Sequence, residues 1–261
     1  MSSLIPCIAF FFATSAESRF LKKHLQLHSR TLLFPHRFFL GKLFLRENSP
    51  LVLLVETGMG PLAARHAAQY AFSHFHIQTA WIFGLAGASQ KGIEPGAAIL
   101  ATQMGFSGTA QEEWISSEPL LVGQAAAFFQ KNFLTHQKGK ILTLEKLLGE
   151  PNEKLKWGEK YKVLALEMEA FPIAEEAQKR KIPLMEIRWI LDPAQYALPP
   201  LENWVDEQGK VKLLSLLAAF FQHPGLIFEL PSFLMKVKKS LGAMNSFLQK
   251  WIKEGYMPSL Y

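Results

Sequence analysis

An acidic cluster directly after a short apolar run is the clearest chemical signal in this sequence. Glu167 and Glu169 flank Met168, and the apolar run before them spans residues 163–166. If that run is a strand of a parallel sheet, the cluster lies at its carboxyl end, where open α/β sheets bind ligands. The carboxylates could then accept hydrogen bonds from sugar hydroxyls while the methionine covers an apolar sugar face. The alternative is an ordinary helix start, because acidic residues favour the first turn.

Two further acidic residues could move protons. Asp192 closes a predicted strand over residues 184–191, and burial at that edge would raise its pKa and make it a proton donor. The plainer interpretation is a turn aspartate before Pro193. Glu17 follows a predicted first strand over residues 8–12, where it could activate water or simply be a solvated glutamate at a helix start. The eight histidines form no convincing metal cluster, so we expect no metal site.

Alternating apolar runs and helical patterns predict an α/β fold that would position these groups. We expect strands at 8–12, 51–55, 80–83, 97–102, 163–166 and 184–191, and helices at 17–28, 62–72 and 169–180. This order implies a mainly parallel sheet with helices on both faces. Thr-Gly-Met-Gly at 57–60 and Gly-Leu-Ala-Gly at 84–87 each end a predicted strand. Such loops can present backbone N–H groups to an anion or a sugar, or can simply be tight turns.

Composition and charge limit the classes of function. The sequence is 49% apolar with one cysteine, which excludes disorder and an intramolecular disulfide. The first apolar run has no basic side chain before it, so we interpret it as a buried strand of a cytoplasmic domain rather than a signal peptide. No apolar stretch is long enough to span a bilayer. The net charge of +6 comes without a recognised nucleic-acid-binding motif, so we expect no nucleic-acid partner.

The C-terminal part of the chain differs in character. From Lys210 onward it carries seven lysines and two acidic residues, and we predict helices at 211–222 and 232–253. We therefore divide the chain into an α/β domain, residues 1–205, and a helical extension packed on it, residues 206–261. A basic and apolar surface within 210–261 could contact a membrane interface peripherally. The simpler alternative is that these helices cover the sheet and place their lysines in water.

Taken in order, the motifs resemble the purine nucleoside phosphorylase and nucleosidase superfamily. That pattern is an acidic loop residue, T-G-x-G, G-x-A-G, E-M-E and R-x-x-x-D, here at Glu17, 57–60, 84–87, 167–169 and 188–192. A closer similarity is to the hopanoid-associated phosphorylases, whose D-P-A-D-x-x-L-P-P resembles residues 192–200, and whose C-terminal extension resembles the region around His-Pro-Gly at 223–225. The resemblance implies a single-domain three-layer α/β/α sandwich with a helical C-terminal extension.

The resemblance also implies an activity and residue roles. The chain would cleave a purine N-ribosyl bond, releasing adenine from adenosylhopane, without metal or organic cofactor. Asp192 would be the general acid at purine N7 and Glu17 would activate water. Glu169 would bind the ribose hydroxyls and Met168 would pack on the sugar. The other substrate-binding positions would be Glu167, Ala86, Gly87 and Gly58. A homo-oligomer is expected, and phosphate is a second substrate if the cleavage is phosphorolytic.

The sequence departs from the family pattern where phosphate would bind. Leu85 stands where the family often has a serine or threonine, and leucine cannot donate a hydrogen bond. Leu191 replaces a serine often found before the aspartate, Ala88 replaces a glycine, and Gln195 replaces an aspartate. These changes favour hydrolysis over phosphorolysis. They also leave a second hypothesis open, a catalytically weak nucleoside-binding protein on the same fold.

Overall fold

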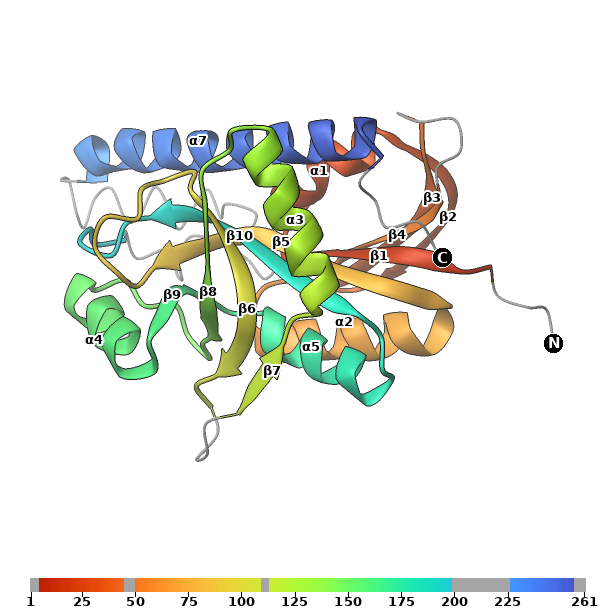
Figure 1. Ribbon diagram of the computed structural model, residues 1–261, viewed down its shortest axis with the longest axis horizontal. Coiled ribbons are helices and arrows are strands. Elements are labelled where there is room, and N and C mark those ends of the chain that lie inside the picture. The colour runs from red at the N-terminus through yellow and green to blue at the C-terminus, as the bar shows by residue number, and fades with distance from the viewer. Residues whose placement is uncertain (1–4, 45–49, 109–112, 199–225, 256–261) are drawn as a thin grey trace.

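One mixed sheet with helices on both faces organises the chain (Figure 1). The computed structural model describes residues 5–44, 50–108, 113–198 and 226–255. Its strands are β1 (Cys7–Phe12), β2 (Leu25–Leu33), β3 (His36–Leu43), β4 (Leu51–Glu56), β5 (Ile77–Ala88), β6 (Ala98–Phe106), β7 (Trp114–Ser116), β8 (His136–Thr143), β9 (Val163–Glu167) and β10 (Leu184–Asp192). Its helices are α1 (Ser15–Lys23), α2 (Pro61–His74), α3 (Pro119–Lys131), α4 (Pro151–Tyr161), α5 (Ala170–Lys179) and α7 (Leu226–Lys253).

The sheet closes on itself at one end. Strands β5, β10, β6, β8 and β9 form a ring, because β10 pairs with both β5 and β6 while β9 returns to β5. Strands β1, β4, β3 and β2 extend the sheet outward from β5. The expected α/β class is confirmed, but the expectation of a mainly parallel sheet is wrong. Five of the ten pairings among the described strands are antiparallel, because the hairpin β2–β3 and the closure of the ring reverse the strand direction.

Alternating side chains give the sheet a core on each face. In β1, Cys7, Ala9 and Phe11 point to the core shared with α2 and α5. Phe10 and Phe12, between them, point to the core shared with α3 and α7. A strand that is buried on both faces reads as a continuous apolar run, which is why this one could be predicted. The three layers of the expected sandwich are therefore present, with helices above and below the sheet (Figure 1).

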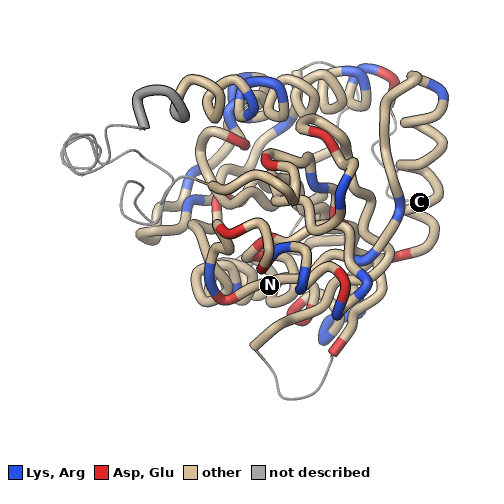
Figure 2. Tube along the Cα trace, turned by 90° about the vertical axis from the view of Figure 1, so that its left-hand side faces the viewer, with Lys and Arg blue, Asp and Glu red and all other residues tan. Residues whose placement is uncertain are grey.

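Helix α7 lies along the sheet at the top of Figure 1. Its buried apolar residues among those described follow helical spacing and are Met244, Phe247, Leu248, Trp251 and Ile252. Basic residues recur along this helix in Figure 2. The predicted helix 232–253 is confirmed and begins earlier, whereas the predicted helix 211–222 and the 205/206 boundary lie outside the described residues. None of the described helices has both the length and the apolar character needed to cross a membrane.

Two predicted elements have the wrong limits. The helix predicted over 17–28 ends at Lys23, and residues 25–28 belong to β2, because β3 supplies their backbone partners. Residues 84–87 do not end a strand. They continue β5, because β10 pairs alongside them from Arg188↔Gly84 to Asp192↔Gly87.

Candidate active site

Asp192 reaches its position through a bulge at the end of β10. Ile190 pairs with Ala86, but the next pair is Asp192 with Gly87, so Leu191 is an extra residue in this strand. Bulges of this kind re-aim a side chain next to a site. The carboxylate oxygens of Asp192 lie 3.2 and 3.3 Å from the point that a Cβ on residue 87 would occupy. The glycine therefore makes room for the carboxylate.

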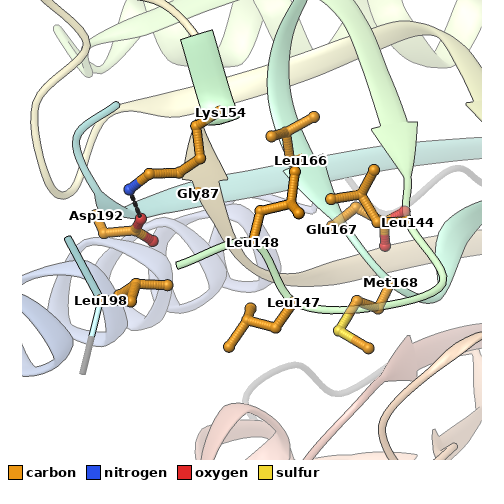
Figure 3. Close-up of a pocket in the computed structure, with 10 residues that line it drawn as sticks. All are labelled: Gly87, Leu144, Leu147, Leu148, Lys154, Leu166, Glu167, Met168, Asp192 and Leu198. Atoms are coloured by element: carbon orange, nitrogen blue, oxygen red, sulfur yellow. Dashed lines mark hydrogen bonds and ion pairs between the residues drawn. The ribbon is translucent and has the colours of Figure 1, made fainter. Parts of the chain in front are cut away.

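A buried lysine from α4 holds Asp192. Lys154 Nζ donates to Asp192 Oδ2 at 2.7 Å, the contact drawn as a dashed line in Figure 3. It also donates to the main-chain oxygens of Pro193 at 3.2 Å and Tyr196 at 2.6 Å, which accounts for all three ammonium protons. Burial raises the pKa of Asp192 above its ordinary value, and the neighbouring ammonium opposes that rise.

Asp192 and Lys154 line a small pocket with mostly apolar walls (Figure 3). The pocket is partly open, and the space within its walls, open solvent included, is about 280 Å³. Its other lining residues are Gly87, Leu144, Leu147, Leu148, Leu166, Glu167, Met168 and Leu198. Apolar walls with a few convergent polar groups are typical of small-molecule sites.

A network of carboxyl groups around one guanidinium adjoins the pocket. Arg188 Nε donates to Glu186 Oε1 at 2.7 Å, and its Nη2 is ion-paired with Glu167 and lies 3.5 Å from Glu169 Oε2. All four side chains are buried. Burial is the main cause that raises the pKa of Glu186 to about 8 and that of Glu169 to about 7. The single positive charge of Arg188 cannot neutralise three neighbouring carboxylates, so some of these carboxyl groups stay protonated near neutral pH.

Backbone N–H groups orient Glu169 and Glu17, the two predicted carboxylates that do not line the pocket. Glu169 Oε1 accepts a hydrogen bond from the N–H of Gly60 at 2.9 Å, which ties the 57–60 loop to α5. Glu17 Oε1 accepts from the N–H of Leu85 at 2.9 Å, and its Oε2 accepts from the N–H of Thr14, also at 2.9 Å. The second bond belongs to a capping box that begins α1. Glu17 is therefore oriented by both a strand and a helix start.

The structure brings half of the predicted site residues to the pocket itself. Asp192, Glu167, Met168 and Gly87 line it. Glu17 and Glu169 do not line it and belong to the neighbouring carboxyl network, where both act electrostatically on Arg188. The N–H of Gly58 already donates to the main-chain oxygen of Ala13 at 3.0 Å, and Ala86, on β5, is buried in the core shared with α2 and α5. The roles of all eight residues in binding or catalysis stay predictions.

Comparison with known proteins places the chain in a family. The family model of the Phosphorylase superfamily matches residues 8–221. The chain belongs to the Phosphorylase superfamily. No curated protein sequence matches it significantly.

Solved structures share the fold of this superfamily member. The futalosine hydrolase of Helicobacter pylori strain 26695 matches with a TM-score of 0.73 and 16% identity over 96% of this chain and 98% of that one. The 5′-methylthioadenosine/S-adenosylhomocysteine nucleosidase of the same organism, bound to butyl-thio-DADMe-Immucillin-A, has a TM-score of 0.74 and 16% identity over 97% and 100%. The corresponding nucleosidase of Neisseria meningitidis has a TM-score of 0.72 and 17% identity over 95% and 99%. At such identities the likeness shows a common fold.

Three buried residues of this Phosphorylase superfamily site were not predicted as site residues. Glu186 and Arg188 sit two residues apart in a predicted strand, so they share one face of it. Two charged residues amid apolar ones were the available signal for the pair, and Arg188 also begins the R-x-x-x-D motif at 188–192. Lys154 gave no comparable signal, because nothing in the sequence of α4 distinguishes it from the exposed Lys156 and Lys160. Its place depends on how α4 packs against β9, close to the end of β10.

Proposed function

We propose that the protein hydrolyses the N-ribosyl bond of a purine nucleoside, with Asp192 as the general acid. The observation that carries the proposal is this buried carboxyl group, with a raised pKa, at the end of β10 in an apolar pocket. Membership of the Phosphorylase superfamily and the fold of known nucleosidases support it. A carboxyl group with a raised pKa keeps a proton to donate closer to neutral pH.

The proposed reaction transfers two protons, breaks one bond at C1′ and forms another there. Asp192 gives its proton to N7 of the base, the C1′–N9 bond breaks, and its electron pair leaves with the base. A water molecule adds to C1′ of the ribosyl group, and Glu17 accepts the proton that this water loses. Glu169 binds the ribose hydroxyls, and Met168 packs on the sugar. The products are a free purine and ribose, or its 5′-substituted derivative.

Water is the proposed nucleophile because the phosphate-binding hydroxyl of the family is missing. Leu85 occupies that position, and its backbone N–H already donates to Glu17 at 2.9 Å. The N–H groups of Gly58 and Gly60 in the neighbouring loop are likewise used, by Ala13 and Glu169. A phosphate ion would need donors from this region, whereas a water molecule needs one acceptor, which Glu17 can supply.

The nucleoside we propose is adenosylhopane or another adenosine derivative with an apolar 5′ substituent. The sequence similarity to hopanoid-associated phosphorylases supports it, and the apolar pocket walls are compatible with a purine ring. An apolar substrate of this kind would reside in a membrane, and a peripheral contact through 210–261 would serve it. Leu234 and Met235 of α7 are 55% and 72% exposed beside the exposed Lys238 and Lys239, which supports this contact.

Adenine release from a 5′-alkyl adenosine, with and without phosphate, tests the proposal. We expect release without phosphate, and a fall of about 10²- to 10⁴-fold in kcat for Asp192→Asn. Glu159→Gln changes an exposed carboxylate on α4 and serves as the matched control. Release that requires phosphate would make the enzyme a phosphorylase, and undiminished release by Asp192→Asn would remove Asp192 from the mechanism. Tight nucleoside binding with no release would identify a binding protein.

A further inference from the structure

A buried cation beside a proposed proton donor is an unexpected arrangement. Lys154 is 1% exposed, and its ammonium lies 2.7 Å from Asp192 Oδ2. An adjacent positive charge favours the ionised carboxylate, whereas a general acid must carry its proton when the base departs. The pair must therefore be accounted for in any mechanism that uses Asp192.

The contacts of Lys154 fix its ammonium in place. Its three hydrogen bonds join α4 to Asp192 and to the turn that follows it, through the main-chain oxygens of Pro193 and Tyr196. The same turn is held from the other side, because Lys236 of α7 lies 4.4 Å from the centre of the Tyr196 ring. With all three donors used, Lys154 is a fixed point of attachment rather than a mobile side chain. Losing it would leave a buried carboxylate without its ion-pair partner.

Few other charges face Asp192 within the described residues. Lys236 reaches it from α7 and lowers its pKa, although more weakly than Lys154 does. Glu167, at the end of β9, lines the same pocket and is itself ion-paired with Arg188. From β5 the pocket receives Gly87, which has no side chain. Lys154 is therefore the principal counter-charge of this carboxyl group.

We propose that Lys154 is the positioning residue of Asp192, holding the carboxyl group against Gly87 and determining how readily it gives up its proton. The catalytic meaning of this assignment rests on the proposed function, but the ion pair can be tested without any substrate. Lys154 keeps the carboxyl group from retaining its proton too tightly in an apolar pocket. The proton then remains transferable to the base, and the carboxylate left behind is already paired.

The sequence makes a direct test practical, because its only aspartates are Asp192 and Asp206. The full chain labelled with ¹³C at the aspartate side-chain carbonyl gives two carboxyl resonances, and Asp192→Asn assigns them. We expect Lys154→Met to move the titration midpoint of Asp192 upward by about one pH unit or more. Lys154→Arg, which keeps the cation, and Lys156→Met, on the exposed side of α4, should leave it near the wild-type midpoint.

A wild-type midpoint in Lys154→Met would overturn the proposal. If this variant does not fold, as judged by circular dichroism, Lys154→Gln replaces it, because its amide can still donate to the two main-chain oxygens. The same expectation and the same refutation apply to that variant. The titration needs no activity, so it decides the role of Lys154 even if no nucleoside is cleaved.

A second readout separates positioning from simple stabilisation of the fold. With an active enzyme, we expect Lys154→Met to lower kcat by about 10- to 100-fold, with a smaller change in KM. The basic limb of the pH profile should move to higher pH, because Asp192 then keeps its proton longer. An equal loss of activity at every pH, without movement of this limb, would reduce Lys154 to a structural role.

Discussion

Replacing Glu186 by glutamine should remove a large part of the pH dependence of stability. Glu186 lies on β10 with no exposed surface, and its Oε1 accepts the 2.7 Å hydrogen bond from Arg188 Nε. Its Oε2 has no hydrogen-bond partner among the described residues. Burial, reinforced by the charge of Glu167, raises its pKa from 4.5 to about 8. Near neutral pH the folded protein therefore holds this carboxyl group in its neutral form.

The sign and size of the effect follow from the two pKa values. Between pH 4.5 and about 8 the folded state keeps a proton that the unfolded state has released. Rising pH therefore favours the unfolded state across this window, and the dependence ends above the folded-state pKa. Each pH unit well inside this window costs about 1.4 kcal/mol, and less as the folded-state pKa is approached, so raising the pH from 6 to 8 should cost about 2 kcal/mol of unfolding free energy through this group alone.

Urea unfolding at pH 6 and pH 8 measures this contribution. At pH 6 the Glu186→Gln variant should already be more stable than the wild type by about 2 kcal/mol, because its amide matches the neutral acid of the folded state, can still accept from Arg188, and has no carboxyl group to ionise in the unfolded state. Between pH 6 and pH 8 this advantage of the variant should grow by about a further 2 kcal/mol. Glu169, with a pKa of about 7, titrates in both proteins, so its contribution largely cancels in the difference. Parallel pH curves for the two proteins would refute the reasoning, since they would mean that Glu186 is already ionised at pH 6.

The remaining predictions concern packing. Gly84→Ala should lower the free energy of unfolding by about 1–3 kcal/mol, because its Cβ would overlap the Arg188 guanidinium and lie 2.8 Å from Glu17 Oε1. Gly123→Ala in α3, where a Cβ meets nothing within 4 Å, should instead raise it by about 0.5–1 kcal/mol, and denaturant unfolding of both variants checks the contrast. Trp251→Ala should cost about 3–5 kcal/mol, because this fully buried ring packs edge-on at 4.6 Å from Trp81. A loss below 1 kcal/mol in the same assay would mean that α7 does not depend on this contact.

Strands buried on both faces could be predicted from the sequence, and exposed strands could not. β1 and β4 appear as continuous apolar runs, because the sheet has a core on either side. β2 carries mostly exposed side chains, so its strand conformation is set by pairing with β3 and is not visible in its own hydrophobic pattern. Two of the five antiparallel pairings, β2–β3 and β3–β4, involve this hairpin, and they depend on partner strands rather than on the local sequence pattern.

The candidate site likewise has features that the sequence could predict and features that it could not. The placement of Asp192 at a strand end could be predicted, because Pro193 and the preceding apolar residues mark that end. The bulge at Leu191, which sets Asp192 opposite Gly87, could not, because an extra residue is defined only relative to the partner strand. The protonated state of Glu186 likewise depends on how many carboxylates share Arg188, which only the folded arrangement determines.

The position of β10 in the ring has a consequence for synthesis of the chain. Although it is the last described strand in sequence, it fills the place between β5 and β6. Until residue 192 has left the ribosome, that place is empty and the facing edges of β5 and β6 are unpaired. Exposed strand edges invite pairing with other chains. Nascent chains halted before residue 184 should therefore be the species most prone to aggregate and most dependent on chaperones.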